Sequence, residues 1–356
     1  MGFIRWLQNL VAKFRKLVEE KIWQQLNKQA VELNNQGKLS EVLEQALTLV
    51  NSLDIGDNRL VAKSLNNFAA LYQSQGRLTE AEPLYDRALA MYQRLFKGDH
   101  PHVAQSLNNL ALLYQSQGRL SEAEPLLDRA LAMRERLFKH DHPDLAVSLN
   151  NLAVVYYFQG YYTKAEPLYD RALAMYQRLF KGDHPHVATS LNNLALLYQS
   201  QGRLTEAEPL YDRALAMYQR LFKGDHPHVA TSLNNLALLY QSQGRLTEAE
   251  PLYDRALAMR ERLFKHDHPD LAQSLNNLAL LYDSQGRLSE AEPLYERALA
   301  MIERLFKGDH NDVASSLNNL ASLYRVQGRL TEAEPLYERA LAMRERLFKH
   351  DHPDLA

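Results

Sequence analysis

The chain has 356 residues, 46% of them hydrophobic and 24% charged, with 41 lysines and arginines against 43 aspartates and glutamates. The net charge of -2, without any basic stripe, argues against nucleic acid as a partner, because phosphate binding needs a basic face. The lack of cysteine excludes disulfides, thiolate metal sites and a cysteine nucleophile. No apolar run approaches the roughly 18 residues of a membrane span, and the N-terminus lacks the apolar core of a signal peptide, so we expect a cytoplasmic protein.

Residues 1–26 form a segment of their own. Ile4, Leu7 and Val11 begin a series of apolar residues at steps of three and four, which predicts an amphipathic helix. We expect this helix to cap the open N-terminal end of the repeats that follow, since such ends need covering. A membrane-surface helix and a helix that binds a partner are the alternative interpretations, because basic residues exceed acidic ones here.

From residue 61 to residue 354 the sequence repeats itself seven times. The closing glycines Gly76 and Gly118 stand 42 residues apart, and a double asparagine precedes each of them. A fixed period of roughly 20 to 50 residues is typical of a solenoid, in which each unit packs only on its neighbours. We expect residues 27–60 to form a degenerate first copy and residues 355–356 to begin a truncated eighth unit.

The first half of each copy predicts an amphipathic helix, helix A. In the fourth copy Leu191, Leu194 and Ala195 stand at i, i+3 and i+4, so they share one buried face. Tyr198 continues this face one turn further on. Gly202 is expected to end the helix, because a left-handed closing residue costs glycine little.

The second half predicts helix B, antiparallel to helix A. We expect it to begin at Thr205, which together with Glu208 matches a capping box. Pro209 then falls in the first turn, where few backbone bonds are lost. The Asp-His-Pro turn leads into the next helix A, and its histidines are interpreted as helix-start residues; a His-x-His site for a transition metal is the alternative, and no metal is predicted.

The pattern of these helices resembles the tetratricopeptide repeat. The 42-residue period, the Leu-Asn-Asn-Leu-Ala opening, the Ala-Glu-Pro-Leu-Tyr helix B and the Asp-His-Pro turn resemble its kinesin light chain variety. The resemblance implies an all-α fold, a right-handed superhelical solenoid of antiparallel helix pairs, with helices A lining a concave groove that binds extended peptide segments of partner proteins. It implies no motor partner, because the long coiled coil of that family has no counterpart beyond the short first helix.

Helix A has a second face, which is expected to point into the groove. Asn192, Asn193 and Leu196 are expected to lie together on this face. An asparagine side chain has two donors and an acceptor, which suits it to hold a peptide backbone without demanding a particular side chain. The alternative is that the asparagines make polar contacts between neighbouring helices. The residues predicted to contact peptide here are Asn67, Asn109, Asn151, Asn193, Asn235, Asn277 and Asn319, the first members Asn150, Asn192 and Asn234 of three pairs, and Gln199 and Gln241.

The third copy departs from the others. Tyr157 and Phe158 replace a Gln-Ser pair, and Tyr161 and Tyr162 follow the closing glycine. Because aromatic residues dominate interface hot spots, we predict that Tyr157 and Phe158 bind peptide and give selectivity. The alternative is that Tyr161 and Tyr162 occupy turn and core positions.

The sequence contains no arrangement typical of catalysis. Glu206 and Glu208 diverge on a helix, and neither a Gly-x-Ser-x-Gly motif nor a Gly-rich phosphate loop occurs. We therefore expect a non-catalytic scaffold without a cofactor, which binds a protein or peptide that the sequence does not identify. The alternative is a structural protein that self-associates through the ends of the array and through residues 1–26.

Overall fold

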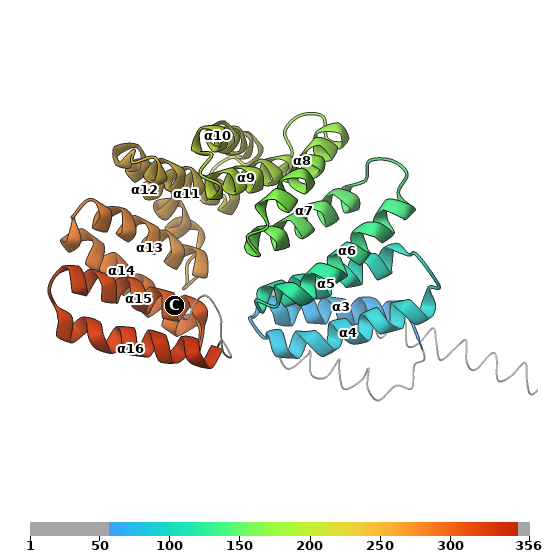
Figure 1. Ribbon diagram of the computed structural model, residues 1–356, viewed down its shortest axis with the longest axis horizontal. Coiled ribbons are helices and arrows are strands. Elements are labelled where there is room, and N and C mark those ends of the chain that lie inside the picture. Colours follow the sequence, from blue (N-terminus) through green and yellow to red (C-terminus); the bar gives the residue numbers. More distant parts are fainter. Residues whose placement is uncertain (1–56, 348–356) are drawn as a thin grey trace, which may run out of the picture. The chain divides into compact units, whose positions relative to one another are not determined.

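The computed structural model describes residues 57–347, and within this range it consists of helices joined by short turns, without any strand (Figure 1). The predictions for residues 1–26, for most of 27–60 and for 355–356 fall outside the described residues. The chain divides into two compact units, Met1–Leu179 and Phe180–Ala356. The first unit contains α3 (Arg59–Ser74), α4 (Leu78–Leu95), α5 (Pro101–Ser116), α6 (Leu120–Leu137), α7 (Pro143–Phe158) and α8 (Tyr162–Leu179). The second unit contains α9 (Pro185–Ser200), α10 (Leu204–Leu221), α11 (Pro227–Ser242), α12 (Leu246–Leu263), α13 (Pro269–Ser284), α14 (Leu288–Leu305), α15 (Asn311–Val326) and α16 (Leu330–Leu347).

Consecutive helices pack as antiparallel pairs inside each unit (Figure 1). The first helix of a pair is helix A and the second is helix B. Helix B of one pair also packs on helix A of the next, as α4 does on α5, and neighbouring helices A touch each other, as α3 touches α5 and α9 touches α11. The prediction of an all-α array of helix pairs is confirmed.

The buried face of helix A follows the predicted spacing. Leu191 and Leu194 are 0% and 3% exposed. A further leucine on helix A is buried without having been predicted, since Leu239 is 0% exposed and packs against Ala207 and Tyr211 of the preceding pair. Helix A is therefore buried on two sides, by its own helix B and by the pair before it.

Glycine closes the turn between helices A and B, as predicted. Gly202 has a φ of 74°, in the left-handed region that other residues rarely adopt. Its N–H donates to the carbonyl of Gln199 at 3.0 Å, and the N–H of Arg203 donates to the carbonyl of Tyr198 at 2.8 Å. These two bonds form a Schellman motif, which satisfies carbonyls at the end of the helix.

The start of helix B differs from the prediction. Helix α10 begins one residue before Thr205, and its N-cap, Arg203, makes no side-chain cap hydrogen bond. The capping box is therefore wrong, because Glu208 accepts a hydrogen bond from Arg245 of the following pair at 2.8 Å. Pro209 consequently lies in the second turn of the helix.

Candidate functional site

In each unit, the A-face is the surface of the helices A formed by the second asparagine of each copy and the residues one turn to either side of it. Apolar side chains remain accessible on it, since Leu196 and Leu280 are 37% and 44% exposed. Solvent-facing leucines interleaved with amides form a surface that can contact both the side chains and the backbone of a partner.

The first asparagine of each pair is directed between helices. Asn234 is 3% exposed, and Asn192, 8% exposed, donates to the hydroxyl of Ser232 on the next helix A at 2.9 Å. Asn66 makes the same bond to Ser106 at 2.9 Å. These amides thus join neighbouring helices A.

The second asparagine lies nearer to solvent than the first in four pairs, at Asn67, Asn109, Asn193 and Asn235. Asn151 donates to the Oδ1 of Asn108 in the preceding copy at 2.9 Å, and Asn277 makes the equivalent bond at 3.0 Å. Asn235 is half-buried, and its side chain makes no hydrogen bond to any other residue of the described range. Asn235 thus keeps its hydrogen-bonding groups near solvent, whereas the first asparagines Asn66, Asn192 and Asn276 each bury an Oδ1 that has no partner among the described residues.

The glutamines predicted to contact peptide connect helix A to helix B. The hydroxyl of Tyr211 donates to Gln199 Oε1 at 3.1 Å, and that of Tyr253 donates to Gln241 Oε1 at 2.9 Å. Gln199 Nε2 also donates to the hydroxyl of Ser242 in the next copy at 3.2 Å. Both glutamines thus hold helices together at the C-terminal edge of the A-face.

The aromatic residues of the third copy gather at the end of α7. Phe158 and Tyr161 are 59% and 49% exposed, whereas Tyr157 is half-buried. The ring of Tyr157 lies 5.4 Å from that of Phe158 and 5.7 Å from that of Tyr162, so the structure brings these three residues together.

Two buried arginines were missed by the sequence reasoning. Arg134 of α6 is 1% exposed, and its guanidinium donates to the hydroxyl of Ser148 at 2.7 Å and to Gln105 Oε1 at 2.8 Å. Gln105 in turn donates to Asn109 at 2.7 Å, so the buried cation is linked to the A-face. Burial lowers the pKa of Arg134. Arg260 of α12 makes the equivalent bond to Ser274 at 2.7 Å.

Three other copies have tyrosine at the position of Arg134, and the sixth copy has Ile302 there. Tyr92 stacks on His102 of the next helix A at 5.2 Å, and Tyr218 stacks on His228 at 5.1 Å. After Arg134 the residue equivalent to these histidines is Asp144, whose carbonyl accepts from the guanidinium at 2.8 Å. The sequence signal for the two kinds of junction is Met-Arg-Glu-Arg or Met-Tyr-Gln-Arg in helix B.

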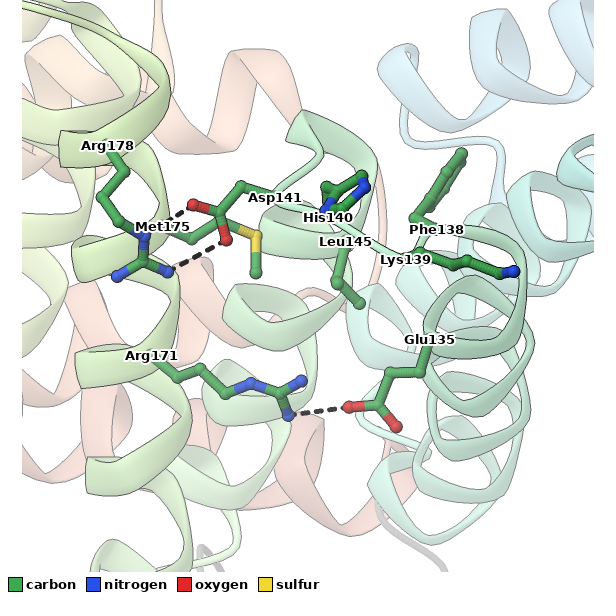
Figure 2. Close-up of a pocket in the computed structure, with 9 residues that line it drawn as sticks. All are labelled: Glu135, Phe138, Lys139, His140, Asp141, Leu145, Arg171, Met175 and Arg178. Carbon is green, nitrogen blue, oxygen red and sulfur yellow. Dashed lines mark hydrogen bonds and ion pairs between the residues drawn. The ribbon is translucent and has the colours of Figure 1, made fainter.

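A pocket of about 290 Å³ lies at the junction that contains Arg134 (Figure 2). Arg171 pairs with Glu135 at 2.7 Å, and Arg178 makes two bonds to Asp141 at 2.6 and 3.0 Å. These ion pairs are partly exposed, so each contributes little to stability. The same pairs recur in the second unit, between Arg297 and Glu261 and between Arg304 and Asp267. We therefore assign this pocket to packing between repeats.

The histidines of the turns begin the helices A. In α9 the Nδ1 atom of His184 accepts the backbone N–H of His186 at 3.2 Å, and its ring stacks on Phe180 at 3.5 Å. Within residues 57–347 no group of three or more His, Asp or Glu side chains is arranged to hold a metal. The N-cap histidines are His100, His142, His184, His226, His268 and His310.

Comparison with known proteins gives both family matches and structural likenesses. A solved structure of BtubC (BKLC) from P. vanneervenii is 29% identical, with a TM-score of 0.55, over 66% of this chain and 94% of that chain. A putative kinesin light chain from Podosopora anserina is 28% identical, with a TM-score of 0.48, over 59% of this chain and all of that one (100%). NprR in complex with its cognate peptide NprX is 15% identical, with a TM-score of 0.59, over 90% and 88% of the two chains. Models described as tetratricopeptide repeat match residues 60–136, 103–178, 144–220, 186–246, 228–304 and 313–354.

A search of curated proteins gives no match. Among the helices of the described residues, none is both long and apolar enough to cross a membrane.

Proposed function

Because this chain belongs to the tetratricopeptide repeat family, whose fold is typical of protein–protein interaction, we propose that it binds an extended segment of a partner protein along the A-face. The binding is non-catalytic and needs no cofactor. The peptide complex of NprR is a precedent for such a ligand on a fold of this kind, although the likeness of that protein to this chain is one of fold alone.

The observation that carries this proposal is the second asparagine of each copy. Asn235 and Asn319 present half-buried amides without a side-chain hydrogen bond to other described residues. Within each unit neighbouring helices A touch, so the second asparagines, one on each helix, form a row along which an extended backbone can exchange donors and acceptors. A row that recognises backbone tolerates many sequences.

We assign different roles to the two members of each pair. Asn192 and Asn234 hold neighbouring helices A in register, since they are buried. The second members contact the partner. Phe158, which stands where five other copies have serine, gives the selectivity that the row lacks.

Affinity recovery tests the proposal. The triple variant of Asn151, Asn193 and Asn235 to alanine should lose most of the proteins that the wild type recovers from source-cell lysate, as identified by mass spectrometry. A matched control replaces Gln93, Gln177 and Gln219, which are exposed on helices B, by alanine and should recover the same set as the wild type. An unchanged set for the asparagine variant, with its circular dichroism intact, would contradict the proposal.

A further inference from the structure

Six of the seven copies carry an arginine directly after the closing glycine, and all six hold it in a similar way. The guanidinium lies over the tyrosine at the end of helix A, at 3.8 to 4.3 Å from the ring centroid. Stacking of a guanidinium on an aromatic ring is favourable because the face of the ring is electron-rich. The pairs are Arg77 with Tyr72, Arg119 with Tyr114, Arg203 with Tyr198, Arg245 with Tyr240, Arg287 with Tyr282 and Arg329 with Tyr324.

Arg245 shows what such an arginine contacts. It donates to Gln243 Oε1 at 2.7 Å and to Glu208 of the preceding helix B at 2.8 Å. It also makes two bonds to Glu248, three residues further on, at 2.8 and 2.6 Å. A ring, an amide oxygen and two carboxylates therefore surround one guanidinium.

In the third copy the arginine is replaced but its partners are kept. Tyr161 stands at the arginine position, yet Tyr156, Gln159 and Glu124 occupy the places of the ring, the amide and the carboxylate of the preceding helix B. Gln159 Nε2 still donates to Glu124 at 3.0 Å, as the glutamine of other copies does. The fourth partner is changed, because Lys164 replaces the second carboxylate.

The kept partners lack a donor. Gln159 Oε1 is buried and has no hydrogen-bond partner among the described residues. A buried polar group without a partner destabilises the folded state, because it has lost its hydrogen bonds to water. Lys164 lies over the rings of Tyr156 and Tyr161, at 5.1 and 4.8 Å, but within the described residues it makes no hydrogen bond or ion pair.

The charge around the site remains suited to a cation. Burial first, and then the carboxylates of Asp128 and Glu124, raise the pKa of Tyr156 to about 12. At the equivalent Tyr240 the guanidinium of Arg245 opposes this rise in pKa. Burial raises the pKa of Asp128 in the third copy, and the charge of Lys164 opposes this rise in pKa, as that of Arg245 does for Asp212. An ammonium without a hydrogen bond to the described residues thus stands in for the bonded guanidinium of other copies.

We infer that this site binds the guanidinium of an arginine side chain from a partner protein, over the ring of Tyr156 and between Gln159 Oε1 and the carboxylate of Glu124. Lys164 is exposed and must swing off the ring to admit it. An ammonium is a poorer ligand, because it lacks the planar set of donors that reaches both acceptors at once. The inference goes beyond the proposed function, since it needs no contact with the asparagines of the A-face.

The test uses N-acetyl-arginine methylamide as the probe and the side-chain amide resonance of Gln159 as the readout. We expect a saturable shift with a dissociation constant on the order of 1 mM, as for a ligand of this size. The citrulline analogue, which has the same shape without the charge, should bind about tenfold more weakly, because charge-assisted hydrogen bonds are the stronger kind. Equal binding of the two probes, or no saturation with the arginine probe, would overturn the inference.

A variant of the third copy supplies the decisive control. Tyr161→Arg combined with Lys164→Glu restores the residues of the other copies, so it should fold at least as stably as the wild type and should lose binding of the probe. Lys164→Ala should strengthen binding by removing the competing ammonium. Lys181→Gln, at an exposed turn residue, matches the net charge change of the double variant and should bind as the wild type does. Undiminished binding by the double variant would also overturn the inference, whatever the asparagine variants do.

Discussion

The guanidinium of Arg134 donates to the hydroxyl of Ser148 at 2.7 Å. At junctions without a buried arginine the equivalent serine accepts from an asparagine instead, as Ser106 does from Asn66. Where an arginine donates to the serine, the asparagines bond to each other, as Asn151 donates to Asn108. One residue of helix B therefore decides how two successive helices A are joined.

Exchanging the junction type at Arg134 should show this coupling. Arg134→Tyr should lower the free energy of unfolding by about 1–3 kcal/mol, because it leaves Ser148 and Gln105 without their buried donor. Adding Asp144→His, which creates the tyrosine–histidine pair of other junctions, should recover about 1 kcal/mol of that loss. Chemical denaturation of the wild type, the two single variants and the double variant measures the coupling energy between positions 134 and 144.

The control for this cycle is Arg136→Tyr, since Arg136 is exposed and pairs with Asp99. That change should leave the free energy of unfolding nearly unchanged, with or without Asp144→His. Strict additivity of Arg134→Tyr and Asp144→His would show that the two positions do not act together.

The histidine caps predict a loss of stability in mild acid. Nδ1 of His226 accepts the N–H of His228 at 3.2 Å, so this atom must carry no proton. Burial first, and then the charge of His228, lower the pKa of His226 below its usual 6.5. Because the unfolded chain takes up the proton first, stability is complete above about pH 6.5 and falls as the pH drops below that value. Thermal unfolding at about pH 7, 6 and 5 measures this loss.

An asparagine cap provides the comparison. Asn58 already caps α3, where its Oδ1 accepts the N–H of Leu60 at 2.8 Å. Replacing His184 and His226 by asparagine should preserve both caps and make the unfolding midpoint less dependent on pH. If the slope between pH 7 and 5 were the same in this variant, carboxylates and not these histidines would govern the acid response.

The side chain of Gln115 lacks a hydrogen-bond donor that a substitution at Leu127 can supply. Its Oε1 is buried without a partner in the described range, because Leu127 stands where other copies have tyrosine. In the first copy the hydroxyl of Tyr85 donates to the equivalent Gln73 at 3.1 Å. Leu127→Tyr should raise the free energy of unfolding by about 1 kcal/mol relative to Leu127→Phe, which adds the ring without the hydroxyl. Equal stability of the two variants would rule out this bond.

The two asparagines of a pair should respond differently to alanine. Asn234→Ala should destabilise the protein by about 1–2 kcal/mol, since Asn234 is buried and accepts from Asn277 at 3.0 Å. Asn235→Ala should change stability by less than about 0.5 kcal/mol, because its side chain is bonded to no described residue. Urea denaturation of both variants separates the roles, and a larger loss for Asn235→Ala would reverse our assignment.

Spacing along one helix predicted much of the fold. It placed Leu191 and Leu194 in the core and Gly202 at the helix end, because these positions depend on contacts within one copy. It did not find the burial of Leu239 or Arg134, which a neighbouring pair covers. The spacing of apolar residues along a helix identifies one buried face. The second buried face, which a neighbouring pair covers, is recognised only by comparing the sequences of the copies.

The candidate site shows the same limit. The sequence points to the double asparagine as a site motif. It does not show that the first asparagine is buried, because the partner of that side chain is a serine of the next copy, as Ser232 is for Asn192. The capping box at Thr205 failed for a related reason, since Glu208 has a stronger cationic partner in the following pair.

Each junction depends on a residue of helix B that matches a residue of the next helix A. This limits where recombination between copies can lengthen the array. A crossover in the turn that contains Gly202 keeps every helix B with its own following helix A, and so keeps Arg134 with Asp144. A crossover in the turn between helix B and the next helix A can separate them and bury a guanidinium against an imidazole. Duplications should therefore survive when their boundaries fall at the glycine turns, which makes helix B followed by helix A, and not the hairpin itself, the unit of inheritance.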